Sequence, residues 1–94
     1  MHTPPHPGEF IQEMFLEPYN LSLRTVAAKL KVSTSTLSCL VNGQSNVTSE
    51  MALRLSKTLG RSPESWLIMQ NNYDLWQVPK RVNLQEVEKI TLSG

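Results

Sequence analysis

Small hydroxyl side chains crowd one short stretch of this 94-residue chain, and such hydroxyls can hydrogen-bond with the edges of DNA bases. A threonine methyl can also contact the methyl group of thymine, and amide side chains can pair with adenine or bond a phosphate. The residues that we expect to read bases are Thr34, Ser35, Thr36, Ser38, Asn42 and Gln44. Contacts of this kind require a rigid element that presents the side chains together.

A helix beginning after Ser33 would present these hydroxyls. The Ser33 side chain can accept hydrogen bonds from the first free N–H groups, and Val32 and Leu37 can form a hydrophobic staple across the start. The Asn42-Gly43 pair tolerates positive φ and would end the helix. The side chains that then face the core are Leu37, Leu40 and Val41. The hydroxyls are therefore predicted on the outer face.

Another helix is predicted just before this one. Its apolar residues recur at the i, i+3, i+4, i+7 spacing of one helix face, and Ser22 can cap its start. The residues of this stripe are Leu23, Val26, Ala27 and Leu30. Two helices joined by a short turn form a helix-turn-helix, whose second helix enters the major groove by its N-terminal residues. The alternative is an ordinary helical hairpin without a role in DNA binding.

The distribution of charge favours a nucleic-acid partner. The formal net charge is only +1, yet no acidic residue lies between Glu17 and Glu50, the window that holds both helices. Lysine and arginine side chains neutralise phosphates, and helix N-termini also hold them. The residues that we expect to bind phosphates are Ser22, Arg24, Lys29, Lys31 and Thr48.

The segment before these helices should hold a tail and one more helix. Residues 1–7 are rich in proline and should form an extended tail that is mobile unless something docks it. A first helix should run from about Gly8 to Glu17, because Pro18 blocks its continuation.

Two further helices are predicted after the hydroxyl-rich one. Thr48 can cap a helix that ends before Gly60. Ser62-Pro63-Glu64 combines an N-cap, a proline at the first helical position and an acid in the first turn, and this fifth helix should end near Trp76. The sequence therefore predicts an all-α fold, with a five-helix domain over residues 8–76.

The fifth helix is apolar on more than one side. A stripe at i, i+3, i+7, i+10 spacing carries two tryptophans and a tyrosine, which is much area for a small domain. We expect the stripe to bury part of its surface against a second copy or another protein, the alternative being that the whole helix is core. The residues of this predicted interface are Trp66, Met69, Tyr73 and Trp76.

Residues 77–94 form a C-terminal tail whose structure the pattern leaves open. Val82 and Leu84 alternate as in a strand, whereas Leu84 and Val87 have helical spacing, with Asn83 and Glu86 as a capping box. A strand, a short helix and a segment ordered only by a partner all remain possible.

Several classes of function are disfavoured by what the sequence lacks. No catalytic arrangement of side chains is at hand, so an enzyme is not expected. His2 and His6 have no further ligands at metal spacing, and Cys39 has no second cysteine, so it is expected to be a small packing residue. We expect no metal and no cofactor. Without a leader or a long apolar run, a cytoplasmic location is expected.

The two central helices resemble the repressor-type helix-turn-helix that phage repressors and bacterial antitoxins share. The resemblance rests on Val26, Ala27, Leu30, Val32, Leu37, Leu40, Asn42 and Gly43. One departure is Lys31, since the family usually has glycine at this turn position. If Lys31 keeps the family's left-handed conformation, it should carry a strain of roughly 1 kcal/mol.

The chain from about Pro4 to Trp76 also resembles the HigA family of antitoxins. The matching runs are Pro4 to Glu9, Leu37-Ser38, Leu40 to Gly43, Ser49 to Leu55, and Trp66-Leu67 with Gln70 and Tyr73 to Leu75. The resemblance implies that the protein neutralises a HigB-type mRNA-cleaving toxin and represses its own operon. Relatives often carry arginine beside Ser38 where this chain has Cys39, so no DNA contact is implied at that position.

Recognition of double-stranded DNA should require a homodimer. One reading helix touches only a few base pairs, whereas a dimer reads two half-sites of a palindromic operator about 34 Å apart. A free-standing repressor without a toxin partner is the alternative to an antitoxin, because its reading helix would be the same.

Overall fold

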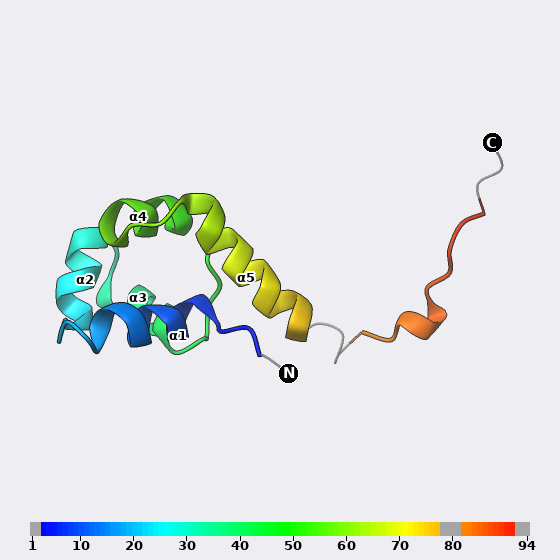
Figure 1. Cartoon of the computed structure of the whole chain (residues 1–94), viewed down its shortest axis with the longest axis horizontal. Coiled ribbons are helices and arrows are strands. Elements are labelled where there is room, and N and C mark those ends of the chain that lie inside the picture. Colours follow the sequence, from blue (N-terminus) through cyan, green and yellow to red (C-terminus); the bar gives the residue numbers. More distant parts are fainter. Residues whose placement is uncertain (1–2, 78–81, 92–94) are drawn as a thin grey trace.

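The computed structural model describes residues 3–77 and 82–91 and is helical throughout its regular elements (Figure 1). These elements are α1 (Pro7–Ile11), the π-helical turn η1 (Gln12–Leu16), α2 (Leu23–Leu30), α3 (Thr34–Val41), α4 (Ser49–Leu59), α5 (Pro63–Gln77) and the 3-10 turn η3 (Leu84–Glu86). The all-α prediction is confirmed, and the predicted helix starts and ends hold to within a residue or two. No helix among the described residues is long and apolar enough to cross a membrane.

Hydroxyl side chains begin three of the helices, as predicted. Ser22, Ser33 and Thr48 have extended backbones, and each side-chain oxygen accepts from the backbone N–H three residues later. The N···O distances are 3.1, 3.0 and 3.2 Å respectively. An N-cap of this type contributes about 1 kcal/mol. The starts of α2, α3 and α4 are thereby fixed by local chemistry.

Trp66 of α5 lies at the centre of the core and has no exposed surface. Its ring packs edge-on against Phe10, with centroids 5.8 Å apart, and its Nε1 donates to the carbonyl of Gly60 at 3.0 Å. The prediction that Trp66 belongs to an interface is therefore wrong. The reason is that α1 and α4 both pack on α5 and cover this side of it. The other buried apolar residues are Ile11, Leu16, Val26, Ala27, Leu30, Leu37, Leu40, Val47, Ala52 and Leu55.

The N-terminal tail is shorter than predicted, because its last residues are part of the folded body. His6 and Pro7 are buried, and α1 begins at Pro7. The His6 ring caps α1, with Nδ1 accepting from the N–H of Gly8 at 2.9 Å, and it packs edge-on against Tyr73 of α5. His2 lies outside the described residues.

Gly8 allows α1 to touch α3 backbone to backbone. A Cβ atom at this position would lie 2.8 Å from the Cα of Val41 and would overlap the carbonyl oxygen of Leu40. Only a residue without a side chain permits this approach. Gly8 therefore sets how closely α1 supports the C-terminal end of α3.

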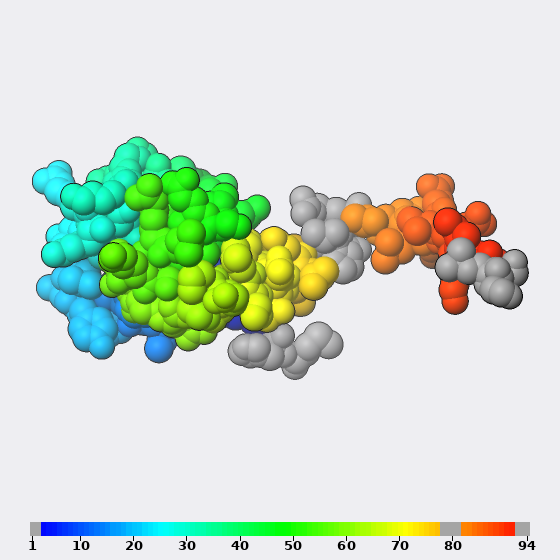
Figure 2. Space-filling model, turned by 90° about the horizontal axis from the view of Figure 1, so that it is seen from above, coloured from blue at the N-terminus to red at the C-terminus, as the bar shows by residue number. Residues whose placement is uncertain are grey.

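Residues 82–91 lie apart from the helical body, and all of them are exposed (Figures 1 and 2). Asn83 caps the short turn η3 by accepting from the N–H of Gln85 at 3.0 Å. Only this single 3-10 turn forms among residues 82–91, and it ends before Val87, which is extended. The rest of the predicted tail, at 78–81 and 92–94, lies outside the described residues.

Candidate DNA-reading surface

The turn between α2 and α3 has the left-handed conformation expected at Lys31, with φ 62° and ψ 41°. The N–H of Val32 donates to the carbonyl of Ala27 at 3.1 Å, and that of Lys31 donates to Ala28 at 3.2 Å. This pair of bonds is the Schellman pattern, which usually has glycine where Lys31 stands. Lys31 therefore keeps the left-handed conformation of the family in spite of its side chain, which is the condition for the expected strain.

The face of α3 opposite the core carries the predicted hydroxyls. Leu37 and Leu40 are fully buried, whereas Thr34, Ser35 and Thr36 are exposed. Because two leucines anchor one side of the helix, the polar side is held in a fixed orientation.

The predicted base-reading residues differ in how free their side chains are. The Thr36 hydroxyl lies 2.8 Å from that of Ser33, so it belongs to the cap. Ser38 is half-buried and accepts from Nδ2 of Asn42 at 3.3 Å. Thr34 and Ser35 have no such partner among the described residues. These two hydroxyls are the best placed of the set for contacts with bases.

Cys39 is exposed, so its prediction as a packing residue is wrong. It follows Ser35 by one helical turn, and side chains four residues apart lie on the same helix face. The sequence contained this signal, since Leu37 and Leu40 take the core positions and leave Cys39 outside. The thiol is therefore part of the face that carries the hydroxyls.

The loop after α3 is held by a buried glutamine that sequence reasoning missed. Gln70 of α5 is 4% exposed, and its Oε1 accepts from the N–H of Val47 at 2.8 Å. Its Nε2 donates to Asn46 at 3.2 Å and to Asp74 at 3.0 Å. Polar groups buried in this way are costly unless they are paired, so the bonds fix the path of the loop.

Asn42 and Gln44 lie on either side of the turn that ends α3, and both are exposed. Gly43 has φ 76°, and the N–H of Gln44 donates to the carbonyl of Cys39 at 2.8 Å. This turn repeats the pattern at the end of α2, here with the glycine that a left-handed residue favours. Both residues are thus exposed at the C-terminal end of α3, and the Asn42 amide lies against Ser38.

The predicted phosphate-binding residues are all exposed, but they do not form one cluster. Ser22 lies at the start of α2, and Lys29 lies in its last turn. An eight-residue helix is about 12 Å long, so these two ends would meet different phosphates. Thr48 lies at the start of α4, with its hydroxyl oxygen engaged in the cap.

A basic groove runs between the C-terminal ends of α2 and α4. It encloses about 320 Å³. The residues that line it are Lys29, Leu30, Lys31, Arg54, Lys57 and Thr58. Among the titratable residues of the described chain, no group of three or more is arranged to hold a metal ion.

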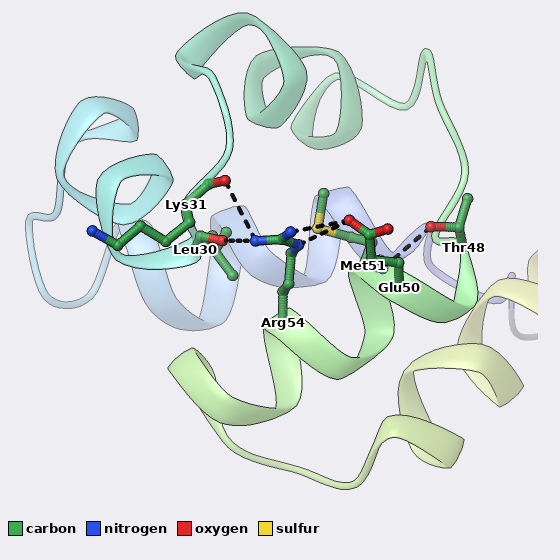
Figure 3. Close-up of polar contacts among 6 residues, drawn as sticks. All are labelled: Leu30, Lys31, Thr48, Glu50, Met51 and Arg54. Atoms are coloured by element: carbon green, nitrogen blue, oxygen red, sulfur yellow. Dashed lines mark hydrogen bonds and ion pairs between the residues drawn. The ribbon is translucent and has the colours of Figure 1, made fainter.

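Arg54 of α4 joins this groove to the turn that precedes α3, a role that sequence reasoning missed (Figure 3). Its Nη1 donates to the carbonyl oxygen of Leu30 at 2.8 Å and, more weakly, to that of Lys31 at 3.4 Å. Its Nε and Nη2 donate to one carboxylate oxygen of Glu50 at 3.2 and 3.0 Å. No local pattern announces such contacts, because the partners are more than twenty residues apart.

The predicted apolar stripe of α5 divides between the core and the surface. Met69 packs against the core, and Tyr73 lies against His6 and accepts from Nε2 of Gln77 at 3.0 Å. Trp76 is half-buried. The most exposed apolar side chains of the helix are Ile68, at 56%, and Leu75, at 71%. An apolar surface therefore exists on α5, on a side that the predicted stripe did not include.

Burial lowers the pKa of His6 below the ordinary histidine value of 6.5, because desolvation disfavours the charged ring. The Ser45 backbone, Asp74 and Glu9 partly offset this effect. Nδ1 accepts from Gly8, so the neutral ring carries its proton on Nε2, which has no hydrogen-bond partner among the described residues.

Comparison with known proteins places these features in context. Residues 12–66 match the family model described as Helix-turn-helix. The chain is 38% identical to the uncharacterized HTH-type transcriptional regulator YddM of Escherichia coli K12, over 96% of this chain and 95% of that protein. It is similar to the structure of antitoxin GraA, with a TM-score of 0.88 and 31% identity over 96% of this chain and 100% of the other. It is also similar to Pseudomonas aeruginosa antitoxin HigA with the higBA promoter, with a TM-score of 0.82 and 30% identity over 94% and 99%.

Proposed function

Because the chain belongs to the helix-turn-helix family and is similar to the antitoxins GraA and HigA, we propose that it represses its own operon as a dimer and neutralises a HigB-type toxin. The observation that carries the DNA-binding part is the exposed hydroxyl face of α3, which rests on two fully buried leucines. In this proposal the protein acts as a DNA-binding regulator in the cytoplasm, where its operator would lie.

Base recognition in this proposal depends on uncharged side chains. Thr34 and Ser35 lie in the first turn of α3, the part of such a helix that reaches the base edges. Asn42 and Gln44 add amide contacts to adenine or to a phosphate. Several modest contacts then set specificity, together with the shape of the DNA groove.

Affinity in this proposal comes from phosphate contacts around the exposed hydroxyl face of α3. Arg24, Lys29 and Lys31 are exposed cations, and Ser22 and Thr48 mark helix N-termini whose N–H groups favour anions. Because no acidic residue lies between Glu17 and Glu50, little electrostatic repulsion opposes the approach of DNA. The nearly neutral protein thus presents its exposed cations at several points around α3, where they would contact different phosphates.

A homodimer brings two reading helices to a palindromic operator. Ile68 and Leu75 of α5 are exposed apolar residues separated by two helical turns, so they lie on one side of the helix. A symmetric contact through this side of α5 would remove the apolar surface from water. We therefore place the interface at Ile68 and Leu75, on a side of α5 that the predicted stripe did not include.

Neutralisation of a toxin is supported by the similarity to antitoxins over nearly the whole chain. The alternative is a free-standing repressor, and the similarity to a protein named only as a transcriptional regulator favours it equally. Co-expression with the products of adjacent genes separates the two. Recovery of a small mRNA-cleaving protein in complex with the chain, together with loss of its cleavage activity, would support the antitoxin.

The experiment that tests DNA reading replaces Thr34 and Ser35 together with alanine. For each good hydrogen bond to a base that disappears, binding to the DNA upstream of the gene should weaken by roughly 1 to 3 kcal/mol. Affinity for a scrambled duplex should hardly change, because phosphate contacts remain. Titration of both duplexes at one fixed salt concentration measures the difference.

Thr58→Ala serves as the matched control, because it removes the same kind of hydroxyl from the C-terminal end of α4. This variant should bind both duplexes like the unmodified protein. An equal loss of affinity on upstream and scrambled DNA in the Thr34 and Ser35 double variant would contradict the assignment of α3 as the reading helix.

A further inference from the structure

We propose that Arg54 is a positioning residue for operator recognition, because it holds the left-handed turn from which α3 begins. The inference rests on the proposed DNA reading by α3 and adds a residue that does not touch bases. Figure 3 shows the guanidinium between Glu50 on its own helix and the turn at Leu30 and Lys31.

The carbonyl groups at the end of α2 explain why the turn needs such a partner. The carbonyls of Ala27 and Ala28 accept from Val32 and Lys31 within the turn. Leu30 is 2% exposed, and its carbonyl points to Arg54, whose Nη1 lies 2.8 Å away. A buried carbonyl without a donor is costly, and a cation at a helix C-terminus is favourable. Arg54 supplies both a donor and a positive charge.

Lys31 makes the turn depend on this support. Its φ of 62° is a conformation that residues with a side chain rarely adopt, and glycine would adopt it without strain. Arg54 bonds the carbonyls on both sides of this strained unit, at Leu30 and at Lys31. The contact therefore opposes relaxation of the turn toward an ordinary backbone conformation.

Glu50 fixes the direction of the guanidinium. The two residues are one helical turn apart on α4, and two of the Arg54 nitrogens donate to the same carboxylate oxygen. With the two carbonyl bonds, the group uses four of its five N–H donors. Although its side chain is 36% exposed, Arg54 is therefore engaged by groups of the protein itself and is not a free cation for DNA phosphates.

The turn matters for recognition because only two residues separate Lys31 from the first residue of α3. Its backbone angles set the direction of α3 relative to α2, and with it the places of Thr34 and Ser35. Base contacts depend on these places, whereas phosphate attraction tolerates small movements. Loss of Arg54 should therefore reduce discrimination between DNA sequences more than it reduces overall attraction to DNA.

The first test compares Arg54→Met with Lys57→Met. Both variants lose one positive charge, and both residues belong to α4 and line the same groove, but Lys57 is exposed and no contact joins it to the turn. Arg54→Met should bind the upstream duplex about tenfold more weakly than Lys57→Met does, a loss comparable to one mismatched base pair. On a scrambled duplex, Arg54→Met should bind no more weakly than Lys57→Met, because Arg54 is already engaged by Glu50 and the turn whereas Lys57 is exposed.

The second test relieves the backbone strain of the turn in a variant that still lacks Arg54. Lys31→Gly removes the strain, so the double variant Arg54→Met with Lys31→Gly should recover part of the discrimination that Arg54→Met loses. Lys31→Gly alone is the reference, because it accounts for any phosphate contact of that lysine. A double variant that discriminates no better than Arg54→Met would overturn the role assigned to the turn.

Arg54→Lys keeps the test decisive if Arg54→Met does not fold, as circular dichroism would reveal. A lysine keeps the charge but cannot reach Glu50 and both carbonyls with a planar group, so partial loss of discrimination is expected. Full discrimination by Arg54→Lys, or equal behaviour of Arg54→Met and Lys57→Met, would refute the inference. If the unmodified protein itself fails to prefer the upstream duplex, the proposed function fails, and the inference fails with it.

Discussion

At residue 31, a lysine holds a backbone conformation that glycine would hold without strain. We predict that Lys31→Gly raises the free energy of unfolding by up to about 1 kcal/mol, since the left-handed strain disappears. Urea denaturation measures the change. The variant also loses a cation, so its affinity for non-specific DNA should fall slightly.

Arg61 offers a control for this prediction, because it also has a positive φ, of 68°. Its guanidinium lies 4.9 Å from the centre of the Phe10 ring, a cation–π contact that glycine would abolish. Arg61→Gly should therefore gain less stability than Lys31→Gly, or lose some. A Lys31→Gly variant that is less stable than the unmodified protein would mean that the lysine side chain contributes more than its strain costs.

His6 makes stability depend on pH. Burial lowers its pKa in the folded state below 6.5, so the unfolded chain binds a proton more readily. The stabilising contribution is complete above about pH 6.5 and is lost as the pH falls toward the folded-state pKa. Protonation of Nδ1 would also remove the acceptor for the N–H of Gly8.

We therefore predict that the free energy of unfolding is lower at about pH 5.5 than at about pH 7.5. His6→Asn keeps a capping acceptor but does not titrate, so this variant should lose less stability over the same range. Equal pH dependence in the two proteins would assign the effect to other groups.

At the scale of elements, α1 supports α3 through a contact that only glycine permits. We predict that Gly8→Ala lowers the free energy of unfolding by about 1 to 3 kcal/mol, because the new methyl group overlaps the backbone of Leu40. Thermal or urea unfolding measures the loss. Operator affinity should fall as well, since α3 must shift to make room.

Gly60→Ala is the comparison for this prediction. Gly60 has φ 97°, and a Cβ atom there would meet nothing within 4 Å. The loss of stability in Gly60→Ala should therefore come only from backbone strain, and α3 should not shift. If the two alanine variants lose stability equally and Gly8→Ala binds DNA normally, the contact between α1 and α3 does not position the reading helix.

Local signals in the sequence were sufficient for most of the elements. Ser22, Ser33 and Thr48 cap helices because their side chains reach N–H groups only three residues away, so the sequence alone predicts the cap. Trp66 was misplaced because α5 is apolar around much of its circumference. Which side is covered depends on how α4 folds back onto α5 and on α1, which is distant in sequence.

The candidate site was predictable to a similar extent. The hydroxyls of α3 follow from helical periodicity, whereas the supports given by Arg54 and Gln70 bridge more than twenty residues. Arg54 and Gln70 both bond to backbone groups, and because nearly every residue has the same backbone groups, the partners cannot be identified from residue types. Side-chain patterns in the sequence therefore predict the exposed hydroxyl face of α3, but not the residues that hold α3 and its neighbouring loop in place.

At the scale of the whole molecule, the exposed aliphatic side of α5 should join two copies. We predict that Leu75→Asp shifts the protein toward monomer, because a symmetric interface would bury an unpaired charge twice. Leu75 is 71% exposed, so the monomer should stay folded. Sedimentation should show the shift, and operator affinity should fall steeply although no reading residue has changed.

Leu53→Asp is the matched control, since Leu53 is a 61% exposed leucine on the outer side of α4. This variant should keep the oligomeric state and the operator affinity of the unmodified protein. A Leu75→Asp protein that stays dimeric and binds its operator normally would move the interface away from this side of α5.

The exposure of Cys39 makes the reading face chemically addressable. The chain has one cysteine, and its thiol lies on the same face of α3 as Ser35. An alkylating reagent therefore labels the protein at this single point, without any engineered substitution. A duplex that admits α3 to its major groove would shield the sulfur, so the rate of alkylation becomes a direct measure of how many reading helices are occupied.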